Sequence, residues 1–182
     1  MSKVWVIADT HFGHKNMAIK RGFKDEFEHD EHIIDKWNSV VHKRDTVYIL
    51  GDVTMESKKW FFRLDSLAGR KIVVLGNHDM RNHIEEMLKY VDQVVGMVKY
   101  SVNGGKSAFL THCPIHTSEL EFRVSGNVHG HIHENIIMKD VQNDPSEPAL
   151  LVPDERYVCV SAEQVNYTPV SLADVIEKII DK

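Results

Sequence analysis

The sequence predicts an α/β fold, with a largely parallel sheet in its first half and a more antiparallel second half. Short apolar runs that end in polar residues alternate with amphipathic segments from residue 4 to about residue 90. After Val94 this alternation gives way to a hairpin pattern and short strands. Strands that alternate with helices favour parallel pairing, because each helix returns the chain to the same edge of the sheet.

Three strands are expected in the first half, and each ends in a polar motif. They span residues 4–8, 46–50 and 71–75, followed by Asp9, Gly51-Asp52 and Gly76-Asn77-His78-Asp79. Helices are expected at about 29–41, 60–67 and 82–90. In the first of these, apolar residues recur at spacings of three and four, which is the period of an amphipathic helix.

The second half predicts a hairpin, two further strands and a closing helix. Residues 96–102 and 107–111 flank an Asn103-Gly104-Gly105 turn, and Asn-Gly is a strong hairpin signal. Strands are expected at 126–129 and 157–160, and a helix at 171–180. The segment 140–153 contains three prolines and several acids, so we expect an exposed loop there.

The composition favours one domain over residues 1–182, since 42% hydrophobic residues are enough for a core. A formal charge of −5 gives no general attraction to long nucleic acid or to an anionic membrane. No apolar stretch reaches the roughly 18 residues of a membrane span. Cys113 and Cys159 lack any CxxC spacing, so neither a disulfide framework nor a cysteine zinc site is indicated. We therefore expect a cytoplasmic protein.

The chain contains 12 histidines, and several of them follow predicted strands together with acids and an amide. Ligands bind where the carboxyl ends of parallel strands open into loops, so five such strand ends would converge on one rim. Mixed carboxylate, imidazole and amide groups suit manganese, iron or zinc better than calcium. The residues concerned are Asp9, His11, Asp52, Asn77, His78, His112, His131 and His133.

The order of these motifs resembles the calcineurin-like metallophosphoesterases, especially their small bacterial and phage members. The five motifs are Asp9-x-His11, Gly51-Asp52, Gly76-Asn77-His78-Asp79, Thr111-His112 and Gly130-His131-x-His133. The tail 165–172 is also similar to the end of those proteins. The resemblance implies a two-sheet αββα sandwich with mixed sheets and with helices on the outside.

The resemblance also implies a centre with two divalent transition-metal ions. Manganese is the first candidate, with iron, zinc and nickel as alternatives. Asp52 would bridge the ions, and a hydroxide shared by them would attack the phosphorus atom of a phosphomonoester or small phosphodiester. His78 would not bind metal but would protonate the leaving oxygen. The first ion would be held by Asp9, His11 and His133, and the second by Asn77, His112 and His131.

Some alternatives stay open on the sequence alone. Many relatives place an Asp or His three residues after the bridging Asp, to orient the catalytic His, whereas this chain has Met55. Either another group, such as Asp79, orients His78, or His78 is held less tightly. His14 either contacts substrate or caps a helix. A catalytically weak metal-binding scaffold and a nuclease subunit are the alternative functions. The oligomeric state and the choice between monoester and diester substrates are not indicated.

Overall fold

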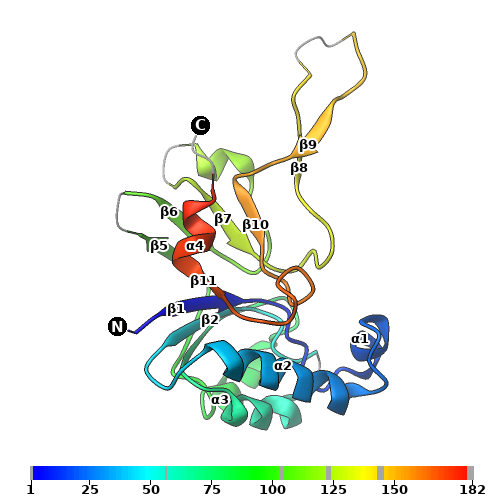
Figure 1. The fold of residues 1–182 in the computed structure, drawn as a ribbon, viewed down its shortest axis with the longest axis vertical. Coiled ribbons are helices and arrows are strands. Elements are labelled where there is room, and N and C mark those ends of the chain that lie inside the picture. Colours follow the sequence, from blue (N-terminus) through cyan, green and yellow to red (C-terminus); the bar gives the residue numbers. More distant parts are fainter. Residues whose placement is uncertain (1, 56, 103–104, 122–123, 143–145, 180–182) are drawn as a thin grey trace.

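The computed structural model is an α/β fold with two main sheets, as the sequence predicts (Figure 1). It describes residues 2–55, 57–102, 105–121, 124–142 and 146–179. The larger sheet has five strands and the smaller has four. Helices are present beside both sheets, and each sheet contains parallel and antiparallel pairs.

The five-stranded sheet has the order β11-β1-β2-β3-β4. Strands β1 to β4 are parallel, and β11 is antiparallel to β1. The three strands expected in the first half are therefore confirmed, whereas β4 and β11 were not expected. The bounds are β1 Val4–Ile7, β2 Thr46–Leu50, β3 Arg70–Val74, β4 Gln93–Val95 and β11 Val170–Ser171.

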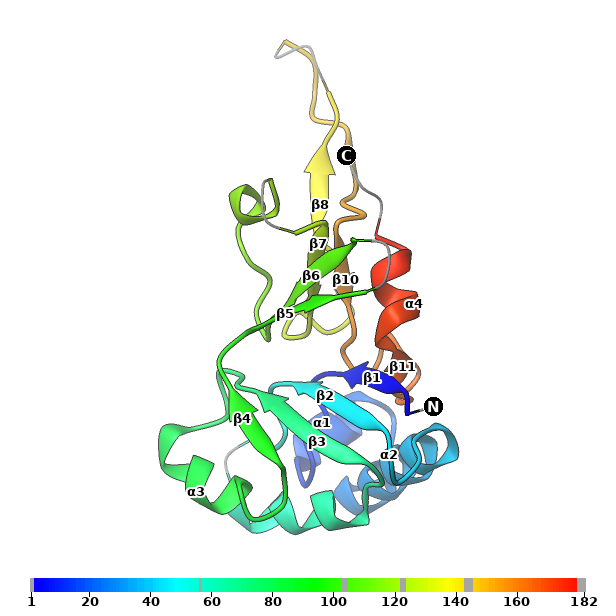
Figure 2. The ribbon, with the colours of Figure 1, turned by 90° about the vertical axis from the view of Figure 1, so that its left-hand side faces the viewer.

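Helix α2 covers one face of this sheet. Its first turn is capped by the side chain of Asp25, which accepts the backbone N–H of Glu28. Ile33 and Trp37 of α2 pack with Ile49 in one apolar cluster on the outer face of the sheet. Figure 2 shows α2 and α3 beneath β1–β4. The bounds are α1 Lys15–Lys20, α2 Glu26–Val40, α3 Ile84–Met87 and α4 Leu172–Glu177, with 3₁₀ helices at Lys58–Ser66, Arg81–His83 and Thr117–Leu120.

Two helices differ in kind from the sequence prediction. The segment expected as a helix at 60–67 is the 3₁₀ helix Lys58–Ser66. The helix expected at 82–90 divides into a 3₁₀ turn and the four-residue α3. Helix α1, directly after the first motif, is the helix that His14 was considered to cap. It is capped by Nδ1 of His14, which accepts the backbone N–H of Met17 at 3.1 Å.

The four-stranded sheet has the order β10-β7-β6-β5 and is more parallel than expected. Only the β5–β6 pair is antiparallel, whereas β7 is parallel to both β6 and β10. The connections before and after β7 are long enough to return the chain for parallel pairing without an α-helix. Asn103 and Gly104 of the expected turn lie outside the described residues. The bounds are β5 Val98–Ser101, β6 Ser107–Leu110, β7 Gly126–His129 and β10 Tyr157–Cys159.

A two-stranded ribbon, formed by β8 (Met138–Asp140) and β9 (Leu151–Pro153), projects away from both sheets (Figure 2). The segment 140–153, expected to be a loop, is therefore exposed but paired at its ends. Leu150 and Leu151 are more than half exposed on it.

The two main sheets share an inner apolar cluster, which is consistent with the expected sandwich. Val6 and Val74 of the first sheet lie in the same cluster as Leu110 and Val128 of the second, and Ile176 of α4 joins them. The outer face of the second sheet carries a small cluster with the short 3₁₀ helix Thr117–Leu120. Within the described part of the chain, no helix is long and apolar enough to cross a membrane.

Candidate metal centre

The structure brings all eight candidate residues together at the carboxyl ends of β1, β2, β3, β6 and β7. Ligand atoms of Asp9, His11 and His133 lie within 4.8 Å of one another, and so do those of Asp9, Asp52 and His112. The side-chain oxygen of Asn77 lies 2.8 Å from His112 Nε2. His131 is joined to Asp9 through its backbone, and His78 is joined to Asp52 in the same way.

Backbone strain is concentrated at this centre. Seven described residues other than glycine have a positive φ, and five of them are candidate ligands. Such a backbone costs about 1 kcal/mol or more per residue and persists where the surrounding structure fixes it, often at functional sites. The five are Asp9 (φ 56°), His11 (48°), Asp52 (52°), His131 (71°) and His133 (52°).

Three buried atoms at the centre have no hydrogen-bond partner among the described residues. They are Oδ1 of Asp9 and both ring nitrogens of His11. The other oxygen of Asp9 accepts hydrogen bonds from Ser161 Oγ (2.6 Å) and from the backbone N–H of His131 (2.9 Å). An unpaired buried polar atom is costly, and a bound cation would satisfy the lone pairs of Asp9 Oδ1 and of one His11 ring nitrogen. The donor set therefore fits a metal ion.

Asp52 lies between two groups of candidate ligands. The first group is Asp9, His11 and His133, and the second group is Asn77, His112 and His131. Its Oδ2 is 3.9 Å from Nε2 of His11 and 3.4 Å from Nε2 of His112. Its Oδ1 accepts the backbone N–H of His78 at 3.0 Å. One carboxylate oxygen thus faces histidines from both groups, while the other fixes the direction of the carboxylate.

The ring of His112 is oriented by the main chain. Nδ1 donates to the carbonyl oxygen of Leu50 at 2.9 Å, so Nε2 is the ring nitrogen that faces Asn77 and Asp52 in the centre. Metal-binding histidines commonly donate the N–H group of their second ring nitrogen to a carbonyl or carboxylate oxygen in this way.

The electrostatics of the centre follow from burial and from neighbouring charges. Burial raises the pKa of Asp9 and, with the charge of Arg21, lowers the pKa of His11 well below its usual range. For Asp52, burial alone would raise the pKa, but hydrogen bonding and charge from His112 outweigh it and the pKa is lowered. His11 is thus held as the neutral imidazole that a metal ion requires.

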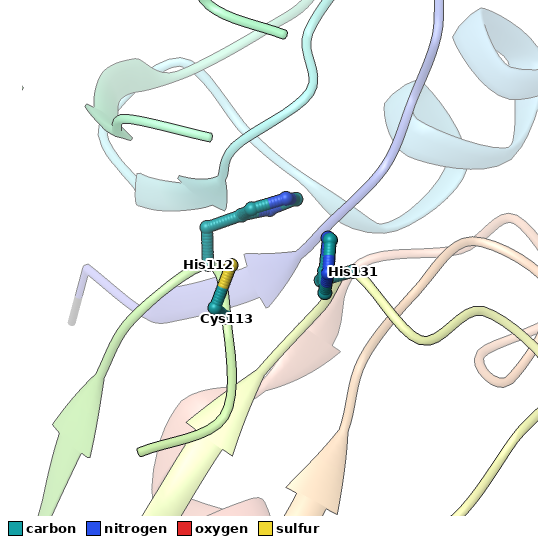
Figure 3. Close-up of side chains that lie close together, drawn as sticks. All are labelled: His112, Cys113 and His131. Carbon is teal, nitrogen blue, oxygen red and sulfur yellow. The ribbon is translucent and has the colours of Figure 1, made fainter. Parts of the chain in front are cut away.

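A thiol lies beside the second group of candidate ligands. Figure 3 shows Cys113 next to His112 and His131, and ligand atoms of these three residues lie within 4.8 Å of one another. Cys113 and Cys159 are both free thiols. The position of Cys113 beside two histidines was not expected, because the sequence has no CxxC motif that would indicate a metal site with cysteine ligands.

Asp79 does not orient the ring of His78. Its carboxylate accepts the backbone N–H groups of Asp52 (2.8 Å), Val53 (3.1 Å) and Gly76 (2.8 Å). Burial raises the pKa of Asp79 to about 6 despite these bonds. Asp79 therefore ties the loop after β2 to the loop after β3, and the His78 ring has no hydrogen bond to a described residue.

A pocket of about 280 Å³ opens next to the centre. Met55 lines it, together with His14, whose ring lies 5.9 Å from that of His11. His14 therefore caps α1, which is one of the two alternatives considered for it, and it also lines this pocket. The other lining residues are Phe12, Gly13, Lys15, Asn16, Ser57, Lys59 and Trp60.

Glycines allow the loops of the centre to approach closely. A Cβ atom on Gly130 would collide with Oδ2 of Asp9 and with the side chain of Ala8. A Cβ atom on Gly76 would collide with Oδ1 of Asp52. Both glycines precede candidate ligands, so any larger residue there would displace a carboxylate of the centre.

Four residues that support the centre were not found from the sequence: Arg21, His29, Ser161 and Glu163. His29 is buried and lies 2.8 Å from Arg21 and 3.1 Å from Asp30. Burial alone would raise the pKa of Glu163, but hydrogen bonds from His133 and Arg21 bring it down to about 2. Nothing in the local sequence marks these residues, because none of them belongs to one of the five motifs.

No protein-family model matches the chain. The crystal structure of AQ665 from Aquifex aeolicus, a protein of unknown function, aligns with a TM-score of 0.73 and 26% identity over 99% of this chain and 100% of that one. Phosphopantetheinyl hydrolase from Mycobacterium tuberculosis aligns only in part, with a TM-score of 0.37 and 19% identity over 60% of this chain and 41% of that one.

The sequence has relatives in an archaeon and in bacteriophages. The uncharacterized protein MJ1445 of Methanocaldococcus jannaschii is 32% identical over 100% of this chain and 93% of its own length. The Gene 66 protein of Mycobacterium phage D29 is 31% identical over 79% of this chain and 84% of its own length. The chain therefore belongs to the same protein family as MJ1445 and the phage Gene 66 protein.

Proposed function

We propose that this protein is a metal-dependent phosphoric ester hydrolase of the calcineurin-like metallophosphoesterase type. Its substrates would be small phosphomonoesters or phosphodiesters, and its cofactors two divalent transition-metal ions, with manganese as the first candidate. The order of the five motifs, from Asp9 to His133, supports this assignment.

The observation that supports the proposal most is the position of Asp52 Oδ2, which faces His11 at 3.9 Å and His112 at 3.4 Å. In this proposal Asp9, His11 and His133 hold one ion, Asn77, His112 and His131 hold the other, and Asp52 bridges them. When bound, two such ions supply a nucleophilic water at neutral pH and offset the charge of the phosphate group. The unpaired lone pairs of Asp9 and His11 favour the same assignment.

His78 has a separate role in this proposal. Its backbone is held by Asp52 at 3.0 Å, and its ring lies 6.2 Å from that of His11. The ring borders the centre without a hydrogen bond to a described residue, so it is free to donate a proton to the leaving oxygen of a bound ester.

The proposal is tested on purified protein with bis-p-nitrophenyl phosphate, p-nitrophenyl phosphate and 2′,3′-cyclic nucleotides. We expect hydrolysis of at least one ester to stop after prolonged treatment with a chelator. Activity should return with manganese more strongly than with magnesium, because imidazole ligands favour the later metals. Undiminished activity in excess chelator, after time for exchange, would refute metal dependence.

Two variants separate the proposed centre from a contaminating enzyme. Asp9→Asn removes the charge of a buried candidate ligand, whereas Asp35→Asn makes the same change at an exposed position on α2. We expect Asp9→Asn to lose both metal and activity and Asp35→Asn to keep both. Equal activity of the two variants would place the hydrolysis outside this centre.

A further inference from the structure

Arg21 is a buried cation that holds the backbone of the first motif. Its side chain is only 1% exposed. Nη2 donates to the carbonyl oxygen of Asp9 at 2.8 Å, and Nη1 lies 3.4 Å from that of Thr10. Asp9 follows β1 with a φ of 56° and is fully buried, so its backbone carbonyl group needs a donor from the protein. Arg21 supplies that donor.

Glu163 connects Arg21 with the last motif. Its Oε1 accepts hydrogen bonds from Arg21 Nε at 2.8 Å and from His133 Nδ1 at 3.0 Å. A carboxylate oxygen only accepts, so the proton of the His133 ring lies on Nδ1 and the lone pair on Nε2. The ring of His133 is stacked on that of His11, with 5.4 Å between the ring centroids. A ligand atom of His133 lies within 4.8 Å of ligand atoms of Asp9 and His11.

The same turn orients a second ligand. Ser161, two residues before Glu163, donates from Oγ to Asp9 Oδ2 at 2.6 Å. The turn that follows β10 therefore contacts both Asp9 and His133, which come from opposite ends of the motif series. On the far side, His29 and Asp30 of α2 extend the network, and Asp30 accepts the backbone N–H of Gly13 at 3.0 Å.

We propose that Glu163 and Arg21 are positioning residues for the first metal ion: Glu163 fixes the tautomer of His133, and Arg21 holds Glu163 and the strained Asp9 backbone. This inference rests on the proposed function, because it requires that Asp9, His11 and His133 bind metal. Outer partners of metal-binding histidines typically change metal affinity by 10- to 100-fold when removed. Neither residue is itself one of the candidate ligands.

Two variants of Glu163 and one control variant test its role by metal binding, without reference to activity. Glu163→Ala removes the acceptor, and Glu163→Gln keeps an acceptor oxygen for His133 but removes the charge. Glu134→Gln is the matched control, because Glu134 lies next to His133 in the sequence but pairs with exposed Lys20 at 3.0 Å. Each protein is stripped with a chelator and titrated with manganese in a calorimeter.

We expect Glu163→Ala to weaken one of two manganese sites by roughly 10- to 100-fold and to leave the other unchanged. Glu163→Gln should weaken the same site less, and Glu134→Gln should match the wild type. Unchanged affinity of both sites in Glu163→Ala would overturn the inference while leaving the proposed function intact. A wild-type protein that binds no metal would instead overturn the proposed function and this inference with it.

Two measurements distinguish positioning from a general loss of stability. The ring nitrogen signals of His133, recorded by NMR on metal-free protein at about pH 9, report the tautomer of a neutral imidazole. We expect the Nδ1–H form in the wild type and in Glu163→Gln, and a shift toward the Nε2–H form in Glu163→Ala. In the wild type, a predominant Nε2–H form would overturn the inference.

The second measurement is the rise in melting temperature when manganese is added. A ligand stabilises the folded state according to its affinity, so weaker binding makes this rise smaller. We expect a smaller rise in Glu163→Ala than in Glu134→Gln. If Glu163→Ala melts lower without metal but shows the full rise with manganese, its role is structural only and the inference fails.

Discussion

Oδ2 of Asp52 lies 3.4 Å from Nε2 of His112, and the second oxygen of the same carboxylate accepts the backbone N–H of His78 at 3.0 Å. One side chain therefore faces a candidate ligand and also fixes the backbone of the candidate acid. This arrangement makes Asp52 the residue on which both halves of the proposed centre depend.

We expect Asp52→Asn to lower the amount of bound metal more than a neutral replacement of any other candidate ligand does. The asparagine keeps the shape and an acceptor for the His78 N–H, but it removes a charge that would interact with both ions. Metal content after dialysis against dilute manganese is the measurement, with Asp35→Asn as the exposed control. If Asn77→Ala released more metal than Asp52→Asn, Asp52 would not be the bridge.

His78→Asn should separate metal content from turnover. Because His78 is proposed to donate a proton and not to bind metal, the variant should keep both ions and lose roughly 10² to 10⁴ in turnover on alkyl esters. The defect should be smaller on nitrophenyl esters, since p-nitrophenolate departs without a proton. Rates on an alkyl and a nitrophenyl ester test this, beside metal stoichiometry. An equal loss on both esters would argue against proton donation.

Gly130→Ala should damage the centre through contact alone. Its Cβ would meet Oδ2 of Asp9 and the side chain of Ala8, and overpacking of this kind costs about 1–3 kcal/mol. Gly96→Ala is the control, because a Cβ there has no heavy atom within 4 Å. Urea unfolding of the metal-free proteins measures the cost, and metal titration measures displacement of Asp9. Equal stabilities of the two variants would contradict the close approach.

Asp45 predicts a pH-dependent contribution to stability far from the centre. Its carboxylate accepts the backbone N–H groups of Lys3 (2.8 Å) and His42 (2.9 Å), and these bonds lower its pKa to about 2. A lowered folded pKa means that the contribution is complete above the unfolded value of about 4 and is lost as pH falls toward 2.

We therefore expect Asp45→Ala to lower the free energy of unfolding by about 2–3 kcal/mol at pH 7, the scale of a hydrogen bond to a charged group. The difference from the wild type should shrink between about pH 4 and pH 2. Urea unfolding at several pH values measures it, with Asp35→Ala as the exposed control. A difference that stays constant down to about pH 2 would contradict the lowered pKa.

The candidate ligands could be predicted because each of them follows a strand, so local sequence places it. Asp52 follows the apolar run that forms β2, and His131 follows β7. Arg21 and Glu163 could not be predicted in this way. Arg21 is buried because the carbonyl groups of Asp9 and Thr10 converge on it, and no local pattern records that convergence.

The parallel pairing of β7 with β6 and β10 in the second sheet was not predicted, for a related reason. Parallel pairing is usually inferred from a helix between two strands, but the chain between β6 and β7 carries only the short 3₁₀ helix Thr117–Leu120. The hairpin of β5 and β6 was found because its pairing is local. Pairing that depends on a long irregular connection has no comparable signal.

The hydrogen bond between Ser161 and Asp9 joins residues that are 152 positions apart. During synthesis, the carboxylate of Asp9 therefore leaves the ribosome long before the hydroxyl group that orients it. Contacts of such long sequence separation form late in folding, because the intervening loop must close first. The orientation that Ser161 gives to the Asp9 carboxylate is therefore available only after the turn that follows β10 has been synthesised and has packed against β1.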